Sequence, residues 1–199
     1  MINFMGVIGM WSEEKMEQYL KENLDSKRYA HSVSVRDTAV KMAEQFNEDI
    51  SKARIAGLLH DCAKNLRGYE LINTAKKYGY NVSEIYQKSP QLLHGLVGAI
   101  ISKEIMGVKD KEIFNAIAYH TTGRRNMTML EKMIYLADYI EPLRKYPGVS
   151  EIRELTYNDI NKAVLRSFDN TIKYVIDRGQ MIHPNTIEGR NYLIKILED

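Results

Sequence analysis

Apolar residues recur every three to four positions through most of this chain, which is the spacing that buries one face of a helix. The clearest set lies on one face of a helix predicted over residues 27–47 and consists of His31, Val35, Thr38, Met42 and Phe46. No stretch alternates apolar and polar residues in the way that a half-buried strand does. The pattern therefore predicts an all-α protein.

Capping and stop signals divide the chain into a series of predicted helices. Thr128 and Glu131 form a capping box before one of them, and Pro142 ends it. The predicted ranges are 12–24, 27–47, 50–62, 69–78, 89–107, 110–120, 129–141, 159–178 and 186–197. Residues 146–150, which include a Pro-Gly pair, are expected to form a turn.

The domain organisation expected from this pattern is simple. Residues 1–10 are apolar, but they are too few for a membrane helix and lack the basic start of a signal peptide, so we expect a short N-terminal extension. Residues 11–199 are expected to form a single domain with a C-terminal helical layer after residue 150. No repeat or low-complexity linker interrupts them.

Composition and charge narrow the class of protein. The 199 residues carry a net charge of only +2, and no block of Lys and Arg is present, so neither nucleic acid nor a membrane surface is an expected partner. The chain contains no run of eighteen apolar residues, so no transmembrane helix is predicted. The single cysteine, Cys62, fits the reducing cytoplasm and excludes an intramolecular disulfide.

Candidate metal ligands stand out against this background. Four of the five histidines and two aspartates fall in the order H…HD…H…H…D, each in a segment predicted to be helical. They are His31, His60, Asp61, His94, His120 and Asp138. Imidazole nitrogens and carboxylate oxygens bind iron, manganese and zinc, and the absence of thiolate ligands disfavours a structural zinc site. Six ligands exceed the needs of one tetrahedral ion, so we expect two metal ions.

The expected arrangement has His31, His60, Asp61 and Asp138 around the first ion, with His94 and His120 at the second and Asp61 between them. Any one histidine on an apolar face is more often a hydrogen-bonded core residue than a ligand. The two aspartates are harder to explain in that way. Both lie in apolar helical surroundings where an unpaired carboxylate is costly, and metal ions would compensate their charge.

Longer strings around these residues narrow the interpretation. They are LLHDCAKNL, LLHGLVGA, AIAYHTTGR, LADYIEPLR and IHPNTIEGRNYL. From about Trp11 onward the chain resembles the HD superfamily of metal-dependent phosphohydrolases, and within it the bacterial symmetrical diadenosine tetraphosphatases of the YqeK family. The resemblance implies an HD-domain helical bundle, a di-iron centre, with manganese as an alternative to iron, and cleavage of diadenosine tetraphosphate into two ADP. It also implies a cytoplasmic enzyme that is often a homodimer.

The expected mechanism is attack of a metal-bound hydroxide on a phosphoanhydride bond. Asp61, Lys64 and Arg124 are the predicted catalytic residues. The predicted substrate contacts are Lys64, Thr121, Thr122, Gly123, Arg124, Arg144 and His183. Simpler explanations exist for several of them: a helix-end charge for Lys64, a solvated side chain for Arg144, local backbone hydrogen bonds for the threonines, and a structural role for the loop residue His183.

Three other functions share some of these features. Another HD-type nucleotidase or cyclic-dinucleotide phosphodiesterase would have the same metal core, and substrate profiling would identify it. A di-iron oxygenase would consume O₂. A non-catalytic HD-like binding module is expected to have lost ligands, whereas all six are present here.

Overall fold

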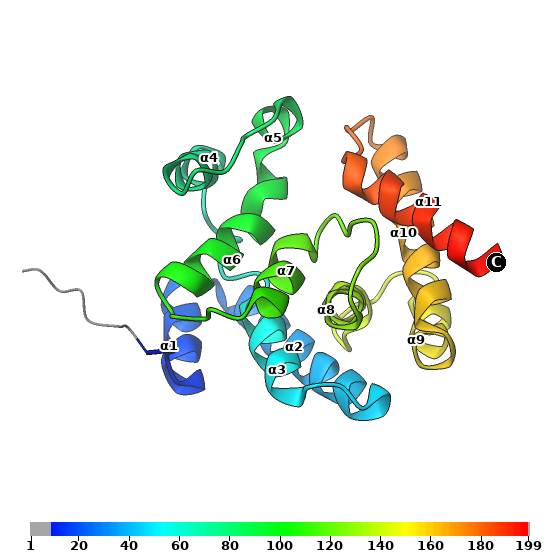
Figure 1. The fold of residues 1–199 in the computed structure, drawn as a ribbon, viewed down its shortest axis with the longest axis horizontal. Coiled ribbons are helices and arrows are strands. Elements are labelled where there is room, and N and C mark those ends of the chain that lie inside the picture. Colours follow the sequence, from blue (N-terminus) through cyan, green and yellow to red (C-terminus); the bar gives the residue numbers. More distant parts are fainter. Residues whose placement is uncertain (1–8, 199) are drawn as a thin grey trace, which may run out of the picture.

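The computed structural model describes residues 9–198 (Figure 1). The first eight residues of the predicted N-terminal extension, residues 1–10, therefore lie outside the described residues. The described part begins in coil, and the backbone N–H of Trp11 donates a hydrogen bond to the carbonyl oxygen of Met106 at 2.9 Å. The start of the described chain is thus attached to the segment that follows α6.

Residues 9–198 contain helices and no strand, which confirms the predicted all-α class. The elements are α1 (Glu13–Asn23), α2 (Ser26–Phe46), α3 (Ile50–Leu59), α4 (Gly68–Lys77), α5 (Glu84–Lys88), η1 (Pro90–Leu93), α6 (His94–Glu104), α7 (Lys111–Tyr119), α8 (Met129–Ile140), α9 (Val149–Asn158), α10 (Ile160–Asp177) and α11 (Pro184–Glu198). None of these helices is both long enough and apolar enough to cross a membrane. The capping box of Thr128 and Glu131 is present at the start of α8.

Several helix boundaries differ from the sequence-based predictions. The helix predicted to reach Cys62 ends at Leu59, so residues 60–66 form turns. The helix predicted over 89–107 is divided into η1, a 3₁₀ turn that begins at Pro90, and α6. The prediction missed the short α5 and all of α9. The missed α9 buries Val149, Ile152 and Thr156, a spacing of three to four that the neighbouring Pro-Gly turn obscured.

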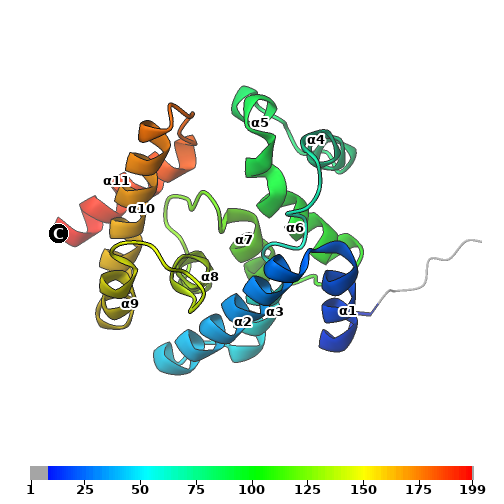
Figure 2. The ribbon, with the colours of Figure 1, turned by 180° about the vertical axis from the view of Figure 1, so that it is seen from behind.

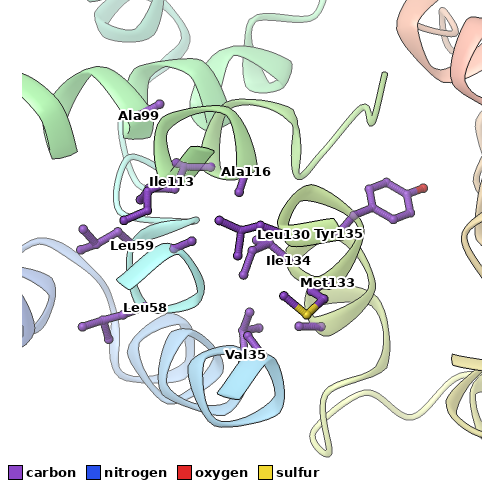
Figure 3. Close-up of a cluster of buried hydrophobic side chains, with 14 of the residues drawn as sticks. Val35, Leu58, Leu59, Ala99, Ile113, Ala116, Leu130, Met133, Ile134 and Tyr135 are labelled. Atoms are coloured by element: carbon purple, nitrogen blue, oxygen red, sulfur yellow. The ribbon is translucent and has the colours of Figure 1, made fainter. Parts of the chain in front are cut away.

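The central core forms where α2, α3, α7 and α8 pack together (Figure 3). Val35 of α2, Leu59 of α3, Ile113 of α7 and Ile134 of α8 lie in this region, and all four are buried. Their removal from water supplies the hydrophobic stabilisation that fixes the relative positions of these helices. The same four helices carry or precede most of the candidate metal ligands.

The C-terminal helices α9, α10 and α11 lie together on one side of α8 (Figures 1 and 2). The fully buried ring of Phe168 in α10 joins them to the centre, because it lies 5.1 Å from the ring of Tyr135 in α8. Its edge also lies over Gly123, where a Cβ atom would come within 2.4 Å of the ring. The division of the chain into one domain stays a prediction.

Candidate metal centre and phosphate site

All six predicted ligands lie in one cluster, although they come from five parts of the fold. His31 is in α2, His60 and Asp61 directly follow α3, His94 begins α6, His120 follows α7, and Asp138 is in α8. His60, Asp61, His94 and His120 are buried. Helix ends therefore contribute more of the cluster than the helix interiors that the sequence pattern predicted.

Short distances join the members of the cluster. Nε2 of His31 lies 3.0 Å from Oδ1 of Asp138. Oδ1 of Asp61 lies 3.1 Å from Nε2 of His94 and 3.4 Å from Nε2 of His120. Two sets of three residues have ligand atoms that all lie within 4.8 Å of one another: His31, His60 and Asp138, and His60, Asp61 and His120. His60 belongs to both sets, whereas the sequence-based prediction placed Asp61 in the shared position.

Three of the histidine rings are held by their own chain. In each, Nδ1 donates a hydrogen bond to the backbone carbonyl three residues earlier. The pairs are His60 with Gly57 at 2.8 Å, His94 with Gln91 at 2.5 Å, and His120 with Ile117 at 2.8 Å. Because a carbonyl only accepts, the proton is assigned to Nδ1, and the lone pair of Nε2 points into the cluster.

The fourth ring is held by a residue that the sequence analysis missed. Nδ1 of His31 lies 3.1 Å from Oε1 of Glu141, whose side chain is only 1% exposed. Oε2 of Glu141 accepts hydrogen bonds from the Ser34 hydroxyl at 2.7 Å and from the backbone N–H of Leu143 at 2.6 Å. A carboxylate that orients a ligating histidine is a common outer partner in metal sites. The sequence could have indicated Glu141 by its position, which is one helical turn after Asp138 and next to Pro142.

Burial and charge set the protonation of the cluster. Burial lowers the pKa of His60 to about 3 and also lowers the pKa of His94. Burial alone would raise the pKa of Asp61, but the surrounding imidazoles of His60, His120 and His94 hold it well below its usual value. The pKa of Asp138 is lowered against the same burial effect by His31 and His60. Neutral imidazoles and ionised carboxylates are the forms that bind metal.

Several candidate ligand atoms make no hydrogen bond within the described residues, although other polar groups of the cluster lie close to them. Nε2 of His31, Nε2 of His60 and Oδ1 of Asp61 are buried without a hydrogen bond. Nε2 of His94 and Nε2 of His120 lie 3.0 Å apart, so two lone pairs face each other. Both arrangements are costly unless a cation lies between the atoms. The residues therefore fit a metal centre of mixed nitrogen and oxygen ligands.

A cavity of about 620 Å³ opens over the cluster. His31, Asp61 and Glu141 form part of its wall, and four cationic side chains also line it. They are Lys27, Arg28, Lys64 and Arg144. Basic side chains beside a metal cluster form a site for phosphate groups, to which arginine can donate two parallel hydrogen bonds.

Lys64 and Arg28 approach the cluster from two sides. Nζ of Lys64 lies 3.3 Å from Oδ1 of Asp61 and 2.9 Å from Nε2 of His94. Nη1 of Arg28 lies 3.9 Å from Oδ2 of Asp61. The sequence analysis missed Arg28, whose signal was its position one helical turn before His31. Arg144 donates hydrogen bonds to both the backbone oxygen and the carboxylate of Asp138.

The loop after His120 reaches the cluster only through Thr121. Its hydroxyl lies 3.0 Å from Nε2 of His94 and 3.1 Å from Nε2 of His120. The hydroxyl of Thr122 donates instead to the carbonyl of Gly123 at 2.9 Å. Gly123 has a φ of 59° and lies under Phe168, so its backbone is held by packing.

Arg124 and His183 lie outside the cluster. Arg124 donates two hydrogen bonds to the buried carboxylate of Glu131, at 2.9 and 2.7 Å, which occupy its guanidinium. His183 packs on the ring of Tyr86, with 5.1 Å between ring centroids, in a separate cavity of about 380 Å³. Their predicted contacts with substrate stay predictions, and the ion pair of Arg124 favours a structural role.

The fold and the cluster define the class of protein. The family model described as "HD domain" matches residues 28–143, more than half of the chain, and this range contains all six ligands. A solved structure from Clostridium acetobutylicum, described as a "predicted HD superfamily hydrolase involved in NAD metabolism", superposes with a TM-score of 0.93. It is 54% identical in sequence, and the match covers 94% of this chain and 100% of that one.

Two curated relatives narrow the family. A protein of Bacillus subtilis (strain 168) named "Bis(5′-nucleosyl)-tetraphosphatase, symmetrical" is 41% identical over 88% of this chain and 94% of its own length. A protein of Staphylococcus aureus with the same name is 40% identical over 90% of this chain and 93% of its own. The chain belongs to this family of HD-domain hydrolases, the symmetrical bis(5′-nucleosyl)-tetraphosphatases.

Proposed function

We propose that this protein cleaves dinucleoside tetraphosphates symmetrically, with diadenosine tetraphosphate as the preferred substrate and two ADP as the products. The observation that supports the proposal is a cluster of six candidate metal ligands beside a cavity lined by four cationic side chains. The names of the B. subtilis and S. aureus relatives supply the substrate class.

Two metal ions are part of the proposal. His31, His60 and Asp138 would hold one ion, and Asp61, His94 and His120 the other, with His60 close to both. When bound, such ions would generate a hydroxide nucleophile from water near neutral pH and neutralise charge on phosphate oxygens. Iron is the preferred metal and manganese the second choice, because the ligands are imidazoles and carboxylates without thiolates.

The cationic side chains would bind and orient the phosphate chain. Lys64 and Arg28 lie near different oxygens of the Asp61 carboxylate, so they can bind the two phosphoryl groups that flank the bond to be broken. Arg144 can neutralise the ADP that leaves. The Thr121 hydroxyl, which lies at the His94 and His120 edge of the cluster, can donate a hydrogen bond to a phosphate oxygen.

Two further features come from the resemblance alone. We propose a cytoplasmic location and a homodimer. Size-exclusion chromatography with light scattering would measure the oligomeric state, and a monomer at micromolar concentration would contradict the homodimer.

The function can be tested by metal analysis of protein purified without chelator, followed by product analysis. We expect about two metal ions per chain and ADP as the only product from diadenosine tetraphosphate. The products ATP and AMP would contradict symmetrical cleavage. Asp61→Asn is the matched control, because it keeps the shape of the side chain and removes a ligand charge, and we expect it to lose both metal and activity with unchanged helical content.

The same assay separates the rival functions. NAD should be tested as a substrate because the description of the C. acetobutylicum relative mentions NAD metabolism. Cyclic dinucleotides should be tested because a cyclic-dinucleotide phosphodiesterase is one of the rival functions. Faster turnover of either would replace the proposed substrate. Oxygen consumption with substrate would support an oxygenase, whereas full hydrolysis under anaerobic conditions would exclude one.

A further inference from the structure

A second cavity, of about 720 Å³, lies beside Asp138 and Arg144. Asp138 and Arg144 line it, and α10 contributes half of the lining residues, including the acidic Asp177. Arg144 also lines the 620 Å³ cavity above the metal ligands. The two cavities therefore share one cationic side chain, which lies beside the cluster.

Aromatic rings dominate one wall of this second cavity. The Tyr146 hydroxyl donates to the backbone oxygen of Tyr139 at 2.8 Å, and their ring centroids lie 5.3 Å apart at 77°. Tyr174 of α10 also lines the cavity, is 56% exposed, and has the Arg178 guanidinium 4.7 Å from its ring centroid. Flat rings that are partly open to solvent offer stacking surfaces for a nucleobase.

Polar side chains form another part of the wall. Asn170, Thr171 and Lys173 of α10 line the cavity together with the aromatic rings. Amide, hydroxyl and ammonium groups can bind the polar edge of a purine or the hydroxyls of a ribose. The cavity thus offers separate surfaces for the face and for the edge of a nucleoside.

We propose that this cavity is the binding subsite for one nucleoside of the dinucleotide, whose phosphate chain passes Arg144 to reach the cluster. The inference rests on the proposed function and adds the residues that recognise one end of the substrate. Tyr174 is the residue expected to contribute most to stacking, because its ring is the most exposed of the three tyrosines.

The other aromatic cavity is a weaker candidate. Tyr86, Tyr119 and His183 line it, together with Tyr80 and Phe114, but none of the six metal ligands and no lysine or arginine is part of its wall. If a nucleoside of the substrate were bound there, no lysine or arginine of this cavity could bind the phosphates attached to it. The connection through Arg144 is what favours the cavity beside α10.

The test compares Tyr174→Leu, which removes the flat ring, with Tyr174→Phe, which retains it. Tyr69→Leu is the matched control, because Tyr69 is 58% exposed and lies on α4, away from both cavities. For diadenosine tetraphosphate we expect Tyr174→Leu to raise KM about 5- to 10-fold, near the low end for a base stacked on a ring, with kcat within about twofold. Tyr174→Phe and Tyr69→Leu should keep the wild-type KM.

Binding of ADP to the same four proteins, measured by calorimetry, provides a readout that is independent of turnover. We expect weaker binding in Tyr174→Leu alone. Unchanged KM and ADP affinity in Tyr174→Leu, with wild-type enzyme that cleaves the dinucleotide, would overturn the subsite and leave the proposed function intact. Wild-type enzyme that does not cleave the dinucleotide would instead overturn the proposed function and the subsite that rests on it.

Discussion

At the scale of single residues, each histidine of the cluster has Nδ1 held by a backbone carbonyl or a carboxylate, which leaves Nε2 facing the other candidate ligands. Three are held by carbonyls of their own helical turn, and His31 is held by Glu141. Such outer hydrogen bonds fix the tautomer and direct the free nitrogen at the metal. Glu141 is therefore predicted to act on metal binding through His31, without contacting the substrate.

We expect Glu141→Gln to weaken metal binding or activity by about 10- to 100-fold, the usual cost of losing an outer partner of a metal ligand. Helical content should stay the same, because the amide has nearly the shape of the carboxylate. Metal titration of protein stripped with chelator would measure the effect. Glu154→Gln, which changes an exposed glutamate of α9, is the control, and equal metal affinity in both variants would contradict the role of Glu141.

Arg124 is a second residue whose role the structure makes testable. Its loss leaves the carboxylate of Glu131 buried without its partner, so we expect Arg124→Ala to lower the free energy of unfolding by about 2 kcal/mol. This figure is below the usual cost of breaking a buried pair because Arg124 is 32% exposed and water screens the interaction. Urea denaturation would measure it.

Arg125→Ala is the matched control for Arg124→Ala. Arg125 is the next residue in the chain, and its exposed guanidinium lies over the ring of Tyr192. We expect that variant to change the free energy of unfolding by less than about 0.5 kcal/mol. Kinetics measured well below the unfolding temperature test whether Arg124 also takes part in catalysis. A large fall in kcat for folded Arg124→Ala, without loss of stability, would restore the catalytic role predicted from the sequence.

At the scale of elements, the ends of helices position the chemistry. The turn after α3 carries His60, Asp61 and Lys64, and the loop after α7 carries Thr121. The second of these loops is held in place by the C-terminal helices, because Phe168 of α10 covers Gly123 and the Thr186 hydroxyl of α11 donates to the carbonyl of Thr122 at 2.8 Å. The C-terminal helices therefore support the loop that follows His120.

Gly123→Ala tests that support. Gly123 has a φ of 59°, and an added Cβ would lie 2.4 Å from the Phe168 ring, so we expect a loss of about 3 kcal/mol from backbone strain and overpacking together. Gly148→Ala is the control, because Gly148 has a φ of 87° with no atom near its added Cβ, and strain alone costs about 1 kcal/mol. Equal losses by urea denaturation would show that Phe168 does not restrain the loop.

Much of the fold, and the gathering of six candidate ligands in one cluster, could be predicted from the sequence. The all-α class follows from the apolar spacing, and the six ligands are residue types that are costly to bury alone. Glu141 and Arg28 were missed because a charged residue near a helix end looks like a solvated side chain until its neighbours in space are known. The ion pair of Arg124 was not foreseen either, since its partner Glu131 had already been assigned to a capping box, and the catalytic role of Arg124 stays a prediction.

At the scale of the whole molecule, the cluster depends on residues far apart in the sequence. His31 and Asp138 meet only when α2 and α8 pack together, so metal ions would bind the folded chain and not the unfolded one. Ligands that bind only the folded state stabilise it. The buried Nε2 atoms of His31 and His60 increase the dependence, because neither makes a hydrogen bond among the described residues.

We expect removal of metal by chelation to lower Tm by about 5 to 10 °C. This corresponds to about 2.7 kcal/mol for an ion at a hundred times its Kd, in a protein of this size. Differential scanning calorimetry with and without chelator would measure the shift, and re-addition of metal should reverse it. An Asp61→Asn protein should show no shift, and an equal shift in that protein would place the stabilising ion elsewhere.

Arg144, the one side chain that lines both cavities, would also fix where along the phosphate chain the substrate is cleaved. If a base is anchored beside α10 and its phosphates must pass Arg144, the number of phosphates between that base and the point of cleavage is fixed by the protein and not by the length of the substrate. A dinucleotide bridged by five phosphates would then still release ADP from the anchored end, with ATP as its other half.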